Sequence, residues 1–193
     1  MRIHGDIKIK RRDTIYSQNN YKKYEPELSE DFGHICGYCG KSEMVSTKGF
    51  EIDHFVPNDI DSSLKTDYNN LVYCCFTCNR KKSNKWPTNN KELPNNGKEG
   101  FVDPATEEYD KHLERATKGD IIAITPVGTY MKEKVFKFHL RPIKEIWKYM
   151  QILHKLDQLD EKQSNLMEEE KNYYITLRQE CNELHKLLFE KKE

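Results

Sequence analysis

The stretch from Cys36 to Lys82 reads CGYCGKSEMVSTKGFEIDHFVPNDIDSSLKTDYNNLVYCCFTCNRKK, and it decides the fold that this sequence predicts. It opens on a Cys-x2-Cys pair at Cys36 and Cys39 and ends shortly after a second pair at Cys75 and Cys78. Zn²⁺ prefers four tetrahedral ligands, and two such turns can place four thiolates on one ion with no open position. The spacing therefore predicts a closed, structural zinc site that helps to fold a region too small to build a large core.

Between and just after these pairs stand residues that suit phosphodiester chemistry. Asp53 precedes His54, and a carboxylate suits a hard cation such as Mg²⁺, whereas a histidine suits proton abstraction. Asn79 and Lys82 share a face if the second cysteine pair opens a helix, because they are three residues apart. We therefore expect Asp53 and Asn79 to hold a cation, and Lys82 and Arg80 to contact phosphate.

The combined pattern resembles a known family. The string Cys-x2-Cys, Asp-His-x-x-Pro, Asn-Leu, Cys-x2-Cys-Asn-x-x-Lys is similar to the HNH (His-Me finger, ββα-metal) endonucleases, over about Cys36 to Lys85. The resemblance implies a phosphodiesterase with structural Zn²⁺ and catalytic Mg²⁺ or Mn²⁺. Position by position, it implies a general base at His54, metal ligands at Asp53 and Asn79, and at Asn70 a hydrogen bond that orients the histidine.

A second resemblance extends over the flanks. It rests on Tyr38-Cys39, Tyr68 to Tyr73, Lys85-Trp86-Pro87 and Val102-Asp103-Pro104, together with the motifs above. These phrases are similar to one HNH branch, which includes the nuclease subunits of Septu-type antiphage systems and retron-linked relatives that work with a partner ATPase. The resemblance implies a DNA-cleaving effector subunit of a bacterial antiphage defence complex.

Composition narrows the class of protein. The chain has 193 residues, of which 33% are charged and 36% hydrophobic, and its 32 basic residues equal its 32 acidic ones. A polycationic nucleic-acid coat is excluded, so binding to nucleic acid needs a local patch. No run of about 18 apolar residues is present, and the N-terminal stretch lacks the apolar segment of a secretory signal. Six cysteines without such a signal favour a reducing cytoplasm.

The predicted fold class is α+β, with four segments. Residues 1–30, with Ile3, Ile7 and Ile9, form a short strand or an arm that leads into the domain, and residues 31–100 form the nuclease core and its following loop. Residues 101–142 add a β-hairpin, because two β-type stretches, 120–125 and 134–140, flank a Pro-Val-Gly-Thr turn. Residues 143–193 are helical, since they contain neither Pro nor Gly.

The helical segment carries an apolar stripe at steps of four, three and four: Leu177, Cys181, Leu184 and Leu188. Either one long helix or an antiparallel hairpin, with a break within Asp157–Ser164, fits this pattern. The stripe needs a partner. Either the segment forms an intramolecular hairpin packed on the nuclease's own β-hairpin, or it docks on another protein, for which the second resemblance suggests the ATPase.

Two other functional classes compete with the nuclease. One is a zinc-ribbon module that binds nucleic acid or protein without catalysis, in which Asp53 and His54 are structural; its binding would be indifferent to Mg²⁺. The other is an adaptor whose helices matter most and whose nuclease is vestigial. The complete set of Asp53, His54, Asn70 and Asn79 favours the nuclease over both.

Overall fold

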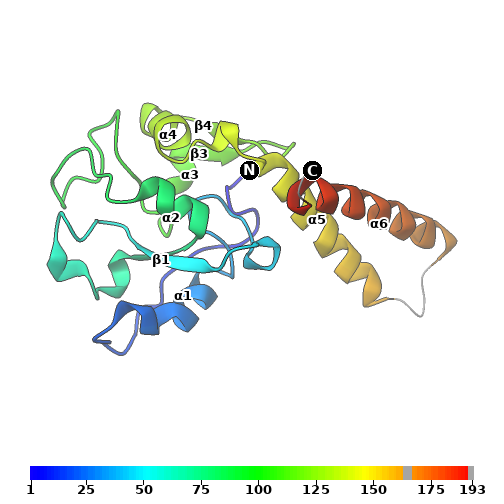
Figure 1. Cartoon of the computed structure of the whole chain (residues 1–193), viewed down its shortest axis with the longest axis horizontal. Coiled ribbons are helices and arrows are strands. Elements are labelled where there is room, and N and C mark those ends of the chain that lie inside the picture. Colours follow the sequence, from blue (N-terminus) through cyan, green and yellow to red (C-terminus); the bar gives the residue numbers. More distant parts are fainter. Residues whose placement is uncertain (163–166, 191–193) are drawn as a thin grey trace. The chain divides into compact units, whose positions relative to one another are not determined.

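The computed structural model describes residues 1–162 and 167–190. The chain forms two compact units, Met1–Arg141 and Pro142–Glu193 (Figure 1). The first unit is a mixed α/β unit with two small sheets, and the second is made of two long helices. The expected combination of short strands, a four-cysteine cluster and long C-terminal helices is therefore confirmed. Among the described residues, no helix is both long and apolar enough to cross a membrane.

The centre of the first unit is a ββα motif. Strand β1 (Phe50–His54) pairs antiparallel with β2 (Leu71–Cys75), and helix α2 (Phe76–Lys82) follows β2 without a loop. All five residues of β2 are buried, so this strand is the inner one of the pair. Three 3₁₀ turns surround the motif, at Glu43–Val45, Ser62–Leu64 and Tyr68–Asn70.

The N-terminal segment contains no strand among its first twenty residues, so of the two alternatives the arm is the one that forms. Ile3 and Ile9 are buried without strand pairing, whereas Ile7 is 36% exposed. The arm ends in a 3₁₀ turn η1 (Tyr21–Tyr24), which runs into helix α1 (Glu25–Asp31). Isoleucine spacing alone could not separate a strand from an irregular segment that buries the same side chains.

The region after residue 100 differs from the predicted hairpin. Strand β3 (Leu113–Arg115) pairs with β4 (Ile121–Ala123), and helix α3 (Tyr109–His112) precedes them. After β4 come helix α4 (Pro126–Thr129), a π-helix (Tyr130–Val135) and a 3₁₀ turn (Phe138–Leu140). The partner of residues 120–125 is thus the preceding segment, and the expected strand 134–140 is wrong.

Two local features explain the helical turns after β4. The Thr125 side chain accepts a hydrogen bond from the Gly128 backbone N–H at 3.1 Å, and Pro126 occupies the first helical position, as expected at a helix start. A Cβ on Gly128 would lie 1.9 Å from the His112 carbonyl oxygen, so only glycine fits there. The buried Phe136 stacks on the buried Phe138, with ring centroids 5.2 Å apart. The apolar side chains of residues 134–140 therefore pack in the core although the segment does not form a strand.

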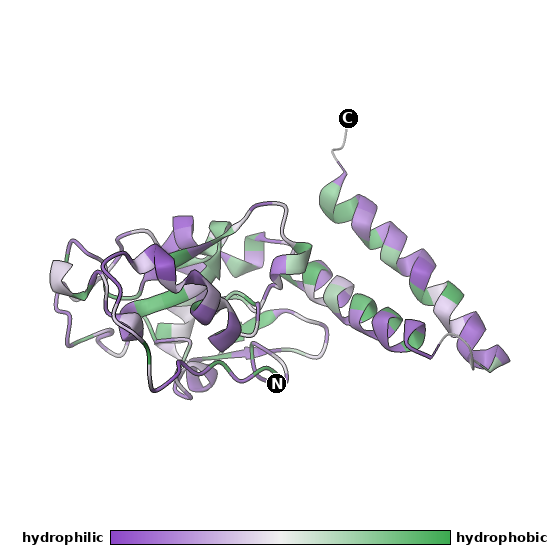
Figure 2. Cartoon of the chain, turned by 90° about the horizontal axis from the view of Figure 1, so that it is seen from below, coloured by the Kyte–Doolittle hydropathy of each residue, from purple (hydrophilic) through white to green (hydrophobic). Residues whose placement is uncertain are grey.

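The second unit is an antiparallel helical hairpin of α5 (Ile143–Asp160) and α6 (Glu168–Phe189). Tyr149 near the start of α5 contacts His185 near the end of α6, and Asp160 at the end of α5 accepts a hydrogen bond from Tyr174 in the first half of α6. The hairpin alternative is therefore the one that forms; α5 ends at Asp160, within the predicted break, of which residues 163 and 164 lie outside the described residues. Hydrophobic residues recur along both helices (Figure 2).

The apolar stripe of α6 packs within this hairpin. Leu177 and Cys181 are 5% and 7% exposed, and on α5 Ile152 and Leu156 are likewise buried. The stripe thus packs on α5, within the intramolecular hairpin that one of the two alternatives expected.

Candidate active site and zinc site

The four paired cysteines form one buried cluster. Cys36 and Cys39 come from the turn after α1, Cys75 ends β2, and Cys78 lies in α2. Their sulfur atoms all lie within 4.8 Å of one another. Four thiol groups with no neighbouring oxygen or nitrogen ligand in the cluster suit a tetrahedral Zn²⁺ without an open position. The cluster could therefore hold a structural zinc that ties this turn to the ββα motif.

Arg141 lies against this cluster. Its guanidinium donates to Cys78 Sγ at 3.3 Å and lies 3.8 and 3.9 Å from the sulfurs of Cys39 and Cys75. A cation here offsets the negative charge that a tetrathiolate zinc site carries. Cys74 is not part of the cluster, because its thiol faces the Glu51 carbonyl oxygen at 3.6 Å.

His54 stands at the end of β1 with one ring nitrogen engaged. Its Nε2 lies 2.9 Å from the backbone carbonyl oxygen of Lys65. A carbonyl oxygen can only accept, so Nε2 carries the proton, and in the neutral ring Nδ1 keeps its lone pair. The Tyr21 ring meets the imidazole edge-on, with centroids 4.6 Å apart and planes at 66°. Both contacts fix the ring in an orientation suited to a general base.

Asn70 does not touch His54, contrary to the expected direct hydrogen bond. Its Oδ1 accepts from the Val56 backbone N–H at 2.8 Å, and its Nδ2 donates to the carbonyl oxygens of Val56 and Leu64 at 3.0 and 3.3 Å. Asn70 is buried and so ties together the two ends of the loop between the strands. Because that loop includes Lys65, Asn70 supports His54 indirectly, through the carbonyl that holds the ring.

Asp53 and Lys82 form a buried ion pair. The Lys82 ammonium lies 3.0 Å from the Asp53 carboxylate, and their side chains are 0% and 6% exposed. Tyr38 donates to the same carboxylate at 2.5 Å, and Lys82 also donates to the His54 carbonyl oxygen at 2.8 Å. Burial raises the pKa of Asp53, and the charge of Lys82 opposes that rise.

This pairing corrects two expectations. Lys82 was expected to contact phosphate, but it is buried beside Asp53, with its ammonium 5.5 Å from the centre of the Phe101 ring. Asp53 was expected to hold a cation, but its carboxylate already binds an ammonium and a hydroxyl. Asn79 directs Nδ2 to the Glu51 carboxylate at 2.6 Å. In this arrangement the Asp53 carboxylate does not fit a hard cation, whereas the contact of Asn79 engages its amide nitrogen and not the oxygen expected to bind the cation.

Arg80 lies at the surface, as a phosphate contact requires. Its side chain is 65% exposed, and its guanidinium pairs with Glu51 at 3.0 Å. Glu51 therefore bridges Asn79 and Arg80, two neighbouring residues of α2. The sequence reasoning missed Glu51, although it lies two residues before Asp53, on the same face of β1.

This geometry agrees with a comparison against protein families. The HNH endonuclease family model matches residues 36–85. The match covers both cysteine pairs and His54, about a quarter of the chain. The HNH domain supports nuclease activity, and HNH nucleases act on nucleic acids and use divalent metals. No curated protein and no solved structure gives a significant match to the chain.

Tyr21 and the Lys65 carbonyl were also missed by sequence reasoning. Tyr21 lies outside the HNH domain, in the arm, and nothing in its neighbourhood marks it as a contact of His54. Tyr24 anchors that turn, because it is 2% exposed and packs edge-on against Tyr68 at 5.1 Å. The Lys65 carbonyl is a backbone atom, and backbone atoms leave no signal in residue type.

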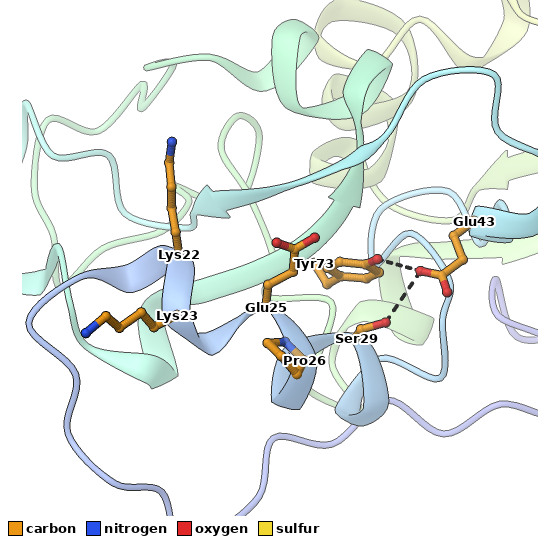
Figure 3. Close-up of a pocket in the computed structure, with 7 residues that line it drawn as sticks. All are labelled: Lys22, Lys23, Glu25, Pro26, Ser29, Glu43 and Tyr73. Carbon is orange, nitrogen blue, oxygen red and sulfur yellow. Dashed lines mark hydrogen bonds between the residues drawn. The ribbon is translucent and has the colours of Figure 1, made fainter.

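A second cluster of polar groups lies beside the arm, in an open pocket of about 650 Å³ (Figure 3). Tyr73 and Ser29 both point to the Glu43 carboxylate, while Lys22 and Lys23 extend away from it. His34 contacts Ser29 Oγ and Glu43 through the same nitrogen, Nδ1, at 2.9 Å each. A nucleophilic triad needs the two ring nitrogens on different partners, so this cluster is not one.

Proposed function

We propose that this chain is an endonuclease that hydrolyses phosphodiester bonds in DNA, with His54 as its general base. The observation that carries the proposal is the hydrogen bond from His54 Nε2 to the Lys65 carbonyl oxygen at 2.9 Å. It fixes the tautomer that leaves Nδ1 as the proton acceptor. The half-exposed ring lies at the end of β1, where water and a phosphodiester can reach it.

In the proposed reaction, Nδ1 of His54 accepts a proton from a water molecule as that water attacks the phosphorus. The bond from phosphorus to the leaving oxygen breaks, and that oxygen takes up a proton from solvent. General base catalysis of this kind contributes about 10²–10⁴-fold to the rate. Asn70 contributes by holding the loop that carries Lys65, and Arg80 contributes a positive charge for the substrate backbone. HNH nucleases use divalent metals, but the Asp53 carboxylate already binds Lys82 and Tyr38, so no step here is routed through a metal ion.

The test is a plasmid-nicking assay with wild type and His54→Ala, each with and without added Mg²⁺. His139→Ala is the matched control, because His139 is an exposed histidine of the same unit. The expected result is a loss of about 10²–10⁴-fold for His54→Ala and wild-type nicking for the control. If His54→Ala nicks plasmid at the wild-type rate, His54 is not the base and the proposal is wrong.

The zinc-ribbon binding module is the competing function. It has the same cysteine cluster and predicts nucleic-acid or protein binding without turnover, unaffected by Mg²⁺. The tautomer of His54 favours the nuclease, because it leaves Nδ1 able to accept a proton, which a purely structural histidine does not need. In the assay above, binding without any nicking by the wild type would favour the module.

The resemblance to Septu-type nucleases leads us to propose further that the chain is the effector of an antiphage complex with an ATPase. The apolar stripe of α6 is already packed on α5, so docking would use side chains that stay exposed on α6, such as Tyr173, Ile175 and Leu187, which are 46–56% exposed. Truncation before Pro142, with co-expression of the ATPase, tests this. Co-purification of the shortened chain with the ATPase would contradict the docking role.

A further inference from the structure

A second pocket, of about 350 Å³, lies between α2 and the segment before β1. Four cationic residues line it, and the other lining residues are small, hydroxylated or aromatic; the full set is Lys41, Ser46, Thr47, Lys48, Cys75, Phe76, Thr77, Arg80 and Lys81. The set includes no acidic residue. Of these residues, only Arg80 was singled out by the sequence as a phosphate contact.

The Phe76 ring positions two of the cations. The Lys48 ammonium lies 4.2 Å from the ring centroid, and the Arg80 guanidinium lies 5.0 Å from it. Such contacts attract a cation to the ring face without neutralising its charge. Lys48 lies before β1 and Arg80 lies in α2, so the two residues are far apart in the sequence. The Phe76 ring brings their positive charges close together.

Like charges this close repel one another, so their gathering needs a compensating negative charge. Glu51 pairs with Arg80, which leaves three lysines of the pocket without an acidic lining residue. The whole chain has equal numbers of basic and acidic residues, so this local excess is a departure from its average. A bound polyanion would supply the missing charge.

The pocket is placed to serve the proposed active site. Cys75, which lines it, pairs with Phe50 at the start of β1, and His54 ends that strand four residues later. At about 3.3 Å per residue, the pocket and His54 are separated by roughly 13 Å along β1. One nucleotide advances roughly 3.4 Å along a duplex axis, so a bound strand would present to the pocket a phosphate several nucleotides from the cleaved one.

We propose that this pocket binds the phosphodiester backbone of the nucleic-acid substrate, with Lys48 and Lys81 as its principal new contacts. The proposal rests on the proposed nuclease function. It adds a local site of positive charge by which this chain, whose net charge is zero, binds its substrate. Backbone contacts by lysine are independent of base sequence and strongly dependent on salt. The pocket therefore predicts binding that is sequence-tolerant and weakened by salt.

The test measures binding separately from cleavage. Fluorescence anisotropy with a labelled DNA duplex is recorded in the His54→Ala background over a series of salt concentrations. Lys48→Ala/Lys81→Ala is compared with Lys118→Ala/Lys134→Ala, which removes two exposed lysines elsewhere in the same unit. The expected result is weaker binding by the pocket variant only, with a salt slope reduced by about 1.8, since each of the two phosphate contacts contributes about 0.9 on a DNA duplex.

Equal affinity and equal salt slope in the two double variants would overturn the proposal, even if wild type cleaves DNA. Zinc content is measured on the same samples, because the lysines also lie near the cysteine cluster. Loss of zinc from the pocket variant, with binding lost in proportion, would assign the lysines to charge balance at the zinc site and would also overturn it. The nuclease proposal fails on a different result, namely nicking that does not depend on His54.

Discussion

The ammonium of Lys82 lies 3.0 Å from the carboxylate of Asp53, and water reaches almost none of either side chain. The pair holds the end of β1 against the last turn of α2, since Lys82 also donates to the His54 carbonyl oxygen. Removing one member of a buried ion pair leaves an uncompensated charge, and such changes cost about 3–5 kcal/mol.

Lys82→Met should therefore lower the free energy of unfolding by about 3–5 kcal/mol in urea denaturation. Lys118→Met is the control, because Lys118 is an exposed lysine of the same unit. Burial already raises the pKa of Asp53, so the loss should shrink at low pH, where Asp53 is protonated. If the Lys82→Met protein is as stable as the control but does not bind DNA, Lys82 contacts phosphate, as the sequence suggested, and the structural role proposed here is wrong.

Asn70→Ala should lower stability by about 1–3 kcal/mol, because it leaves the buried Val56 backbone N–H without an acceptor. It should also slow nicking, since the Lys65 carbonyl loses its support. Asn69→Ala should behave as wild type, because Asn69 is exposed. Thermal unfolding and nicking rates of the two variants check both points. If Asn70→Ala has the same stability and nicking rate as Asn69→Ala, the Asn70 side chain does not support the loop that carries Lys65.

The four-cysteine cluster was predictable from sequence, because each half of it is a Cys-x2-Cys pair. The burial of Lys82 was not, since it depends on Asp53 and on Phe101, which is distant in the sequence. The strand partner of residues 120–125 was missed for a similar reason. Its partner, Leu113–Arg115, is only three residues long, too short for a periodic signal.

Tyr21→Ala should slow nicking by about 2- to 10-fold, because an aromatic edge contact contributes about 0.5–1.5 kcal/mol to holding the His54 ring. Tyr21→Phe keeps the ring and should restore the rate. Tyr16→Ala serves as the control, since Tyr16 is 89% exposed. Steady-state kinetics should show the change in kcat more than in KM. A change confined to KM would place Tyr21 in substrate binding.

Arg141→Gln should weaken zinc binding by about 10–100-fold, the usual effect of removing a group that supports metal ligands. Zinc release into a chelator, followed by a colorimetric indicator, measures this. Arg2→Gln is a suitable control, because Arg2 pairs with Asp110 rather than with the cysteine cluster. Identical release from both variants would show that the guanidinium does not offset the thiolate charge.

His4 makes the stability of the first unit depend on pH. Its ring is buried, stacks on Tyr109 with centroids 5.7 Å apart, and donates through Nε2 to the Gly37 carbonyl oxygen at 2.6 Å. Burial lowers the pKa of His4 from 6.5 to about 4. The unfolded chain therefore binds a proton more readily than the folded one, so this stability is complete above about pH 6.5 and is lost as the pH falls toward 4.

Between about pH 7 and pH 5.5, His4 should account for a loss of about 1 kcal/mol in the free energy of unfolding. His4→Phe keeps an aromatic ring beside Tyr109 but cannot bind a proton, so its stability should fall less over this interval. Urea denaturation of wild type, His4→Phe and His139→Phe at several pH values separates this effect from the acid release of zinc, which all three proteins share. If the His4→Phe curve parallels that of wild type, proton uptake by His4 does not drive the acid sensitivity.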